Sequence, residues 1–265
     1  MDYRVIILSL LISGCGYVDK IKPTEEVNNN AEMLALYNER LAEAKSWDDG
    51  WPVKDDCDGL VWAGVACMAG LDVNLELAFD GGRPYRTPAK TCFEEGRSRS
   101  SISNDGMVAA IGCLKVAKLK EMARYGENNN WVYGDPWPDG LGEVYLKPWF
   151  QGLLGRATGE NKSYSKIPLT LVYSPEDYPA HIQTLAMIKQ EQLTGGLSSE
   201  NIALLKKYHE RDPGDYLIRS VYARYNRGVT EPFTDVLPPS YVRGTGVRRL
   251  ALAHWLLAAK IYLSL

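Results

Sequence analysis

Apolar residues recur at helical spacing over much of the chain, and this periodicity limits the fold more than any other feature of the sequence. A stripe near the start consists of Met33, Leu34, Tyr37, Leu41 and Ala44. A stripe near the end consists of Val247, Leu250, His254, Leu257 and Ile261. Positions three and four residues apart share one face of an α-helix, so each stripe predicts a helix with a buried face.

Signals for helix starts divide the rest of the chain. They occur at Asp56 or Asp58, Ser103, Ser174-Pro175, Ser198 and Asp212-Pro213. The helix that begins after Ser103 is expected to run to about Tyr125, and residues 169–173 are the main strand signal. About eight or nine helices joined by loops predict an all-α domain of stacked helical hairpins with long aromatic loops.

The composition fits a soluble globular domain. Hydrophobic residues make up 45% of the chain and charged residues 24%, enough for a core and a solvated surface. A net charge of -3 and a pI near 5.7 argue against nucleic acid as a partner. The apolar segment 250–265 is short for a membrane span and contains His254 and Lys260, so it predicts a buried helix.

The N-terminus has the pattern of an export signal. A short apolar run, residues 5–12, is followed by small residues and then by Cys15. Ile12-Ser13-Gly14-Cys15 resembles the lipobox of bacterial lipoproteins, in which the cysteine receives lipid. This resemblance implies a signal peptide at 1–14, a tether at 15–30 joined to membrane lipid through Cys15, and one helical domain at 31–265. Gly16, where an Asp would indicate inner-membrane retention, favours the outer membrane. The alternative is a buried N-terminal strand with a chance cysteine.

Four cysteines remain if Cys15 is lipidated, and an exported protein can pair them. Cys57 and Cys92 fall at a helix start and in a loop, and we expect one disulfide between them. Cys67 and Cys113 fall inside helical patterns and are interpreted as buried free thiols. The spacing of these four cysteines matches no zinc pattern, so no metal site is predicted.

Two loops are rich in tryptophan and aspartate. They contain Trp47 and Trp51 in the first loop and Trp131 and Trp137 in the second. Indole rings stack on the apolar faces of sugars, and long ordered loops often carry function, so these residues are candidates for substrate binding. The alternative is that each tryptophan fixes its loop to the core.

Arginines are concentrated between these loops. Arg83, Arg86, Arg97 and Arg99 precede the helix start at Ser103. Guanidinium groups beside a helix N-terminus favour anions, which indicates an acidic ligand such as a uronic acid, phosphate or carboxylate. In the alternative interpretation, Arg97 and Arg99 pair with neighbouring glutamates on a solvated surface.

The carboxylates best placed for acid–base chemistry are Asp58 and Asp105, each in the first turn of a predicted helix. A glycosidase needs two such groups, one on each side of the bond that is cleaved. A lyase needs a base, for which Tyr85, Tyr133 and His181 are candidates. As the alternative, both aspartates are helix caps and the histidines belong to helix surfaces or the core.

Helical hairpins with Trp/Asp-rich loops at one end resemble the α/α-toroid (six-hairpin) glycosidases and lyases in organisation. The resemblance covers residues 31–265 and implies a partial or small toroid. No nucleotide, dinucleotide or metalloprotease motif is present in the sequence, so no cofactor is predicted. The sequence therefore predicts an envelope lipoprotein enzyme that cleaves an acidic polysaccharide, as a glycoside hydrolase or a lyase. The alternative is a non-catalytic lipoprotein that binds glycans or an envelope protein.

Overall fold

The computed structural model describes residues 20, 31–45, 59–90, 93–94, 97–98, 101–134, 144–226, 233, 235 and 247–264. The α-helices of these residues are α1 (Ala31–Lys45), α2 (Gly59–Ala69), α3 (Asn104–Cys113), α4 (Val116–Asn128), α5 (Pro148–Thr158), α6 (Asp177–Thr194), α7 (Ser199–Arg211), α8 (Tyr216–Ala223) and α9 (Val247–Tyr262). Two short 3-10 helices, η1 (Leu75–Ala78) and η2 (Tyr164–Lys166), accompany them. The all-α class is confirmed, whereas closure of the helices into a toroid stays a prediction.

The strands are short and form three antiparallel pairs in the described part of the chain. They are β1 (Phe79–Asp80) with β2 (Arg83–Pro84), β3 (Phe93–Glu94) with β4 (Arg97–Ser98), and β5 (Val132–Gly134) with β6 (Val144–Tyr145). The strand expected at residues 169–173 is wrong. This segment has no regular secondary structure and pairs with none of the described strands, and Gln183 donates a side-chain hydrogen bond to the Val172 carbonyl at 2.9 Å.

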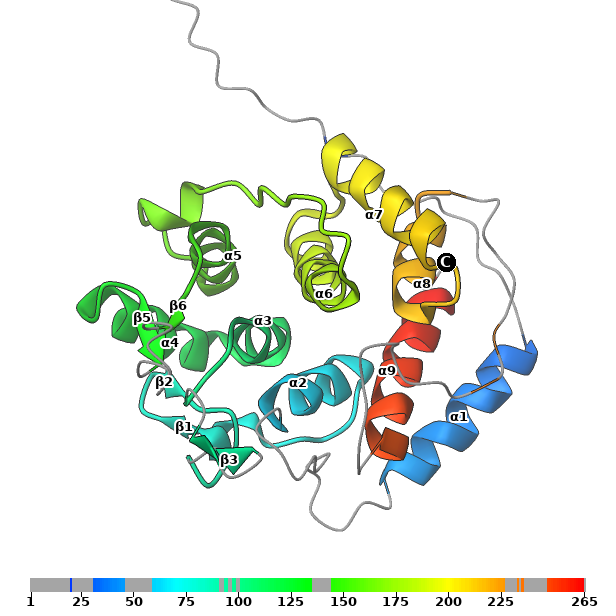
Figure 1. Cartoon of the computed structure of the whole chain (residues 1–265), viewed down its shortest axis with the longest axis horizontal. Coiled ribbons are helices and arrows are strands. Elements are labelled where there is room, and N and C mark those ends of the chain that lie inside the picture. Colours follow the sequence, from blue (N-terminus) through cyan, green and yellow to red (C-terminus); the bar gives the residue numbers. More distant parts are fainter. Residues whose placement is uncertain are drawn as a thin grey trace, which may run out of the picture.

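In Figure 1, α2, α3, α6, α8 and α9 lie around the middle of the molecule, with α1, α4 and α7 outside them. α2 and α3 are parallel and very close, because glycines line their contact. A Cβ added to Gly64 would lie 2.5 Å from Ala109 Cβ, and one turn further along Gly112 faces Met68. The two helices therefore approach more closely than larger side chains would allow.

The remaining inner helices run in the same direction. Lys189, in the second half of α6, donates to the Gly112 carbonyl at the end of α3 at 3.3 Å. Lys260, near the end of α9, donates to the Met68 carbonyl at the end of α2 at 2.8 Å. An ammonium group stabilises helix carbonyls at a C-terminus, where the helix dipole is negative. The C-terminal ends therefore meet on one side of the domain and the N-terminal ends on the other.

The interpretation of Cys67 and Cys113 as free thiols is wrong, because they form a disulfide between α2 and α3. Their Cα atoms are 6.0 Å apart, a normal separation for a bridged pair. The close glycine contacts bring the two helix ends within this reach, which helical periodicity alone did not reveal. The expected Cys57–Cys92 disulfide lies outside the described residues.

The helix predicted from Ser103 to about Tyr125 is in fact two helices. Ser103 is the N-cap as expected, but Leu114 has an extended backbone (ψ 148°), and α4 starts at Val116. α3 is buried on nearly all sides, whereas α4 has one buried face, so the chain turns outward between them. Ser198 caps α7 as expected, but Asp215 rather than Asp212 caps α8.

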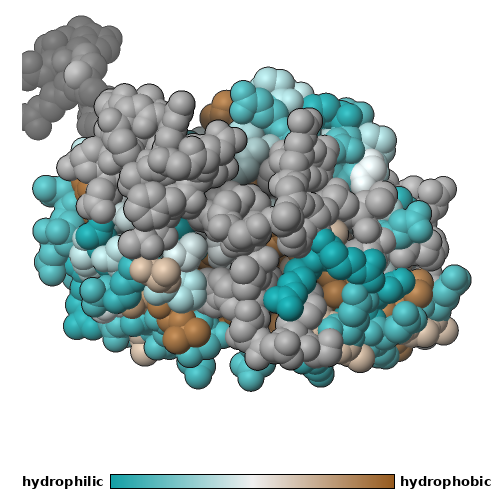
Figure 2. Space-filling model, turned by 60° about the horizontal axis from the view of Figure 1, so that its bottom comes forward, coloured by the Kyte–Doolittle hydropathy of each residue, from teal (hydrophilic) through white to brown (hydrophobic). Residues whose placement is uncertain are grey.

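α9 confirms the buried helix expected near the C-terminus, with Trp255 and Leu256 fully buried. None of the described helices is both long enough and apolar enough to cross a membrane. Figure 2 shows a face whose described surface is mainly hydrophilic, with separate apolar spots.

Candidate functional site

A cleft of about 410 Å³ lies where the N-terminal ends of α3, α5 and α6 meet. Its described lining residues are Arg86, Ile102, Ser103, Asn104, Val144, Lys147, Trp149, Phe150, Tyr178, Pro179, Ile182 and Gln183. The first turns of three helices thus border one cavity, and backbone N–H groups there have no partner within their own helix.

Backbone hydrogen bonds fix the position of Arg86 at this cleft. Its N–H donates to the Ser101 carbonyl at 2.8 Å, and its carbonyl accepts from Leu60 N–H at 2.7 Å. The first bond ties Arg86 to the segment that enters α3, and the second ties it to the first turn of α2. Arg86 is 8% exposed, so its guanidinium is held close to the domain rather than in bulk solvent.

The second cation comes from the start of α5. Lys147 is the N-cap of this helix, and its carbonyl accepts from Phe150 N–H at 2.9 Å and Gln151 N–H at 3.0 Å. Pro148 occupies the first helical turn, where a residue without an N–H is well tolerated. The helix start therefore places exposed Lys147 at the rim of the cleft.

The described lining residues of the cleft carry a net positive charge. Arg86 and Lys147 are its cations, and none of the described lining residues is an acid or a histidine. The N-terminal end of α5, which has no acid in its first turn, adds partial positive charge. At α3 and α6 this effect is reduced, because Asp105 and Asp177 place a carboxylate in the first turn of each helix.

Two aromatic side chains form part of the wall. Trp149 is half-buried, and Tyr178 is 42% exposed although it is a large apolar ring. The described wall contains no carboxylate. The cleft therefore combines two cations with the partly exposed rings of Trp149 and Tyr178. This arrangement can hold an anionic group and stack against an apolar ring face at the same time.

The structure brings only part of the predicted site together. Arg86 lines the cleft, but Arg83 does not, since its Nε donates to the Tyr133 carbonyl at 3.0 Å and its guanidinium lies 5.0 Å from the Tyr85 ring centre. Trp131 packs edge-on against Tyr164, with ring centres 4.8 Å apart. This contact fits the alternative interpretation, in which the tryptophan fixes its loop to the core.

Asp105 is the one predicted catalytic carboxylate that the structure describes. It lies in the first turn of α3 beside Asn104, is 2% exposed and is not a lining residue of the cleft. Several other predicted residues lie outside the described part of the chain: Cys15, Trp47, Trp51, Cys57, Asp58, Cys92, Arg99 and Trp137. Of Arg97 only the backbone in β4 is described.

The three candidate bases do not reach the cleft. Tyr133 is buried and donates to the Met122 carbonyl at 2.7 Å, and burial strongly raises the pKa of its hydroxyl. His181 is 1% exposed, and burial, with a smaller effect of His254, holds its pKa well below the ordinary value. Tyr85 lies beneath Arg83 and Lys90 rather than in the cleft.

Sequence reasoning missed Lys147, Trp149 and Tyr178. The segment Lys147-Pro148-Trp149 carries a helix-start signal, proline in the first turn, and could have been found from it. Tyr178 follows the start signal at Ser174-Pro175, but its exposure could not be foreseen from periodicity alone. All three reach the cleft only because α5 and α6 pack side by side.

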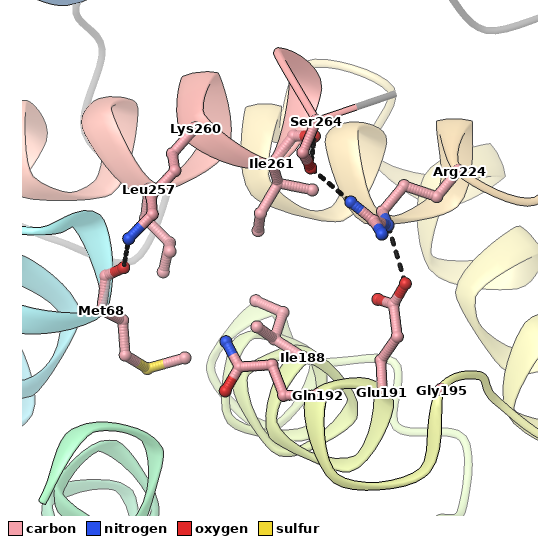
Figure 3. Close-up of a pocket in the computed structure, with 10 residues that line it drawn as sticks. All are labelled: Met68, Ile188, Glu191, Gln192, Gly195, Arg224, Leu257, Lys260, Ile261 and Ser264. Atoms are coloured by element: carbon pink, nitrogen blue, oxygen red, sulfur yellow. Dashed lines mark hydrogen bonds and ion pairs between the residues drawn. The ribbon is translucent and has the colours of Figure 1, made fainter. Parts of the chain in front are cut away.

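A different cavity, of about 400 Å³, opens between α2, α6, α8 and α9 at their C-terminal ends (Figure 3). Its polar groups largely satisfy one another. Arg224 Nε donates to Glu191 at 2.7 Å and the guanidinium also bonds Ser264, while Lys260 holds the end of α2. Because these side chains bond to one another and to the end of α2, their presence has a structural explanation, and we assign no ligand to the cavity.

Within the described residues there is no cluster of three or more His, Cys, Asp or Glu side chains that could hold a metal ion. Comparison of the chain with protein-family models, with curated proteins and with solved structures finds no match.

Proposed function

We propose that this protein binds an acidic saccharide of the cell envelope in the cleft between the N-terminal ends of α3, α5 and α6. The observation that carries the proposal is the composition of the described wall: two cations, Arg86 and Lys147, no acid, and the aromatic rings of Trp149 and Tyr178. A uronic acid matches both features, because it joins a carboxylate to a ring with an apolar face.

The strength of charged hydrogen bonds supports an acidic sugar rather than a neutral sugar as the ligand. A hydrogen bond between a guanidinium and a carboxylate contributes ~1.5–3 kcal/mol, about twice a neutral bond. Arg86 is nearly buried, so solvent screens its interaction less than that of an exposed lysine. Lys147 is exposed and contributes mainly to long-range attraction of the ligand.

Cleavage of the saccharide is the second candidate function, as a glycoside hydrolase or a lyase. It is favoured by one observation, the position of Asp105 in the first turn of α3 next to cleft-lining Asn104. Since Asp105 is buried and does not line the cleft, binding has the stronger support. Anchoring to the outer membrane through Cys15 is part of the proposal, on the strength of the lipobox resemblance.

The test is binding of uronic-acid oligosaccharides by isothermal calorimetry, with neutral oligosaccharides of equal length beside them. Arg86→Gln should weaken binding of the acidic ligand at least tenfold, Lys147→Gln about threefold, and Trp149→Ala should weaken both ligands. Lys166→Gln is the matched control, since Lys166 is exposed and does not line the cleft. Raised salt should weaken the wild-type interaction, because part of it is ionic.

Two results separate the outcomes. Equal affinity for acidic and neutral oligosaccharides, or unchanged binding by Lys147→Gln and a folded Arg86→Gln, would remove the basis of the proposal. Appearance of new reducing ends, or of unsaturated sugars in the case of a lyase, would select cleavage. Loss of that activity in Asp105→Asn, with binding retained, would then assign the carboxylate to the reaction.

A further inference from the structure

Exposed apolar side chains gather directly beside the saccharide cleft. Val172, Tyr173 and Tyr178 are 72%, 43% and 42% exposed, and Tyr178 also lines the cleft. Single exposed apolar residues are common, but these three fall close together around the start of α6. Figure 1 shows the segment between η2 and α6 at the outer edge of the molecule. The open aromatic surface is thus not confined to the lining of the cleft.

Gln183 connects the cleft to this segment. It lines the cleft, and its side-chain Nε2 donates to the Val172 carbonyl at 2.9 Å. Its Oε1 accepts from the Tyr208 hydroxyl at 2.9 Å. The Tyr208 ring in turn stacks on the Tyr173 ring, with ring centres 5.6 Å apart and an angle of 24° between the planes. Tyr173 is therefore joined to a wall residue of the cleft through a single side chain.

The backbone around Tyr173 is held by side chains, although this segment has no regular secondary structure. Ser174 N–H donates to the Tyr208 hydroxyl at 3.3 Å, and the Ser174 carbonyl accepts from Arg211 Nη1 at 2.8 Å. With the bond at Val172, the residues on both sides of Tyr173 are fixed. The ring itself rests on fully buried Tyr208. Tyr173 is therefore an exposed ring in a fixed position, and a ligand would lose little free energy in ordering it.

A lysine gives this surface a positive charge. Lys207 of α7 is exposed, and its Nζ lies 6.0 Å from the Tyr173 ring centre. Lys207 forms no ion pair with a described carboxylate, whereas the neighbouring Lys206 pairs with Glu210 at 3.6 Å. A uronic-acid unit whose apolar face rests on Tyr173 would bring its carboxylate within reach of the Lys207 ammonium group. The surface thus repeats the combination found in the cleft, an aromatic ring beside a cation.

We propose that an outer subsite, formed by Val172, Tyr173 and Lys207, binds a further unit of the same acidic saccharide chain that occupies the cleft. The inference rests on the proposed function and deepens it, because it makes the ligand a polymer of acidic sugars rather than a single sugar. The chain would run from the cleft past Tyr178 onto Tyr173. A second subsite on one chain is occupied by an intramolecular step, so affinity should rise with the number of sugar units.

Calorimetry with a uronic-acid disaccharide and a hexasaccharide tests the outer subsite in the full chain. The wild type should bind the hexasaccharide at least tenfold more tightly. Tyr173→Ala should remove most of this advantage, and Lys207→Gln should weaken hexasaccharide binding about threefold, while neither variant changes the affinity for the disaccharide. Tyr173→Phe keeps the ring and should behave as the wild type. Lys206→Gln is the matched control, because it removes an equal charge from α7 at a residue that pairs with Glu210.

Different results overturn the outer subsite and the cleft. Equal affinity of the wild type for the two saccharides, or wild-type hexasaccharide affinity in a folded Tyr173→Ala, overturns the outer subsite and does not affect the cleft. If Tyr173→Ala unfolds, Lys207→Gln decides, and unchanged hexasaccharide affinity there overturns the outer subsite. Absence of binding of either saccharide, or wild-type affinity for both in a folded Arg86→Gln, overturns the proposed function and the outer subsite with it.

Discussion

The stability of this fold should fall in mild acid because of two histidines in its core. His181 of α6 and His254 of α9 are each 1% exposed, and their ring centres are 5.4 Å apart. Trp62 of α2 lies against His181 at 5.9 Å, and Asp215 of α8 lies 3.7 Å from His254 Nε2. Burial is the main cause that lowers the pKa of both histidines below the ordinary value.

The sign of the pH dependence follows from the lowered pKa values. In the unfolded chain each histidine takes up a proton as the pH falls through ~6.5, whereas in the folded state it stays neutral to lower pH. Each therefore lowers the free energy of unfolding by at most ~1.4 kcal/mol per pH unit as the pH falls below ~6.5, over the range in which its folded form stays neutral. Asp215 acts in the opposite direction, because burial raises its pKa and the folded state holds its proton to higher pH.

Urea unfolding at a series of pH values between 7.5 and 5 measures this effect. His181→Gln and His254→Gln should each reduce the slope, by at most ~1.4 kcal/mol per pH unit, whatever their effect on stability at pH 7.5. His209→Gln is the comparison: burial lowers the pKa of His209 too, but this residue is less buried and lies against Tyr222, so its loss should reduce the slope less. A wild-type slope that persists in both core variants would refute the reasoning.

Three further predictions concern packing and anchoring. Gly64→Ala should lower the free energy of unfolding by ~1–3 kcal/mol, because its Cβ would lie 2.5 Å from Ala109 Cβ, and urea unfolding of this variant beside Ala109→Gly checks the clash. Removing the disulfide by Cys67→Ser with Cys113→Ser should cost ~2–4 kcal/mol; a non-reduced digest without the linked peptide would contradict the bridge. Cys15→Ala should abolish lipid labelling and membrane retention, and an unacylated wild type would end the anchoring proposal.

Only part of the cleft could be predicted from the sequence. Arg86 was found because arginines cluster before a helix start, and the same reasoning selected Arg83, which instead binds the Tyr133 carbonyl. The two arginines are three residues apart, and nothing in the sequence says which one turns toward the cleft. Lys147 and Trp149 come from a segment far along the chain, which local patterns cannot connect to Arg86.

The sequence by itself determined that the domain is helical and where several of its helices lie, because spacing of apolar residues and capping residues act within a few residues of one another. The stripes in α1 and α9 and the cap at Ser198 located three of them, although Leu34 of the α1 stripe is exposed. Only the tertiary structure decided that α2 and α3 approach closely enough to join Cys67 to Cys113, and that the first turns of α3, α5 and α6 border one cleft. Those features depend on how whole helix faces fit together, and such contacts join residues that are distant in the sequence.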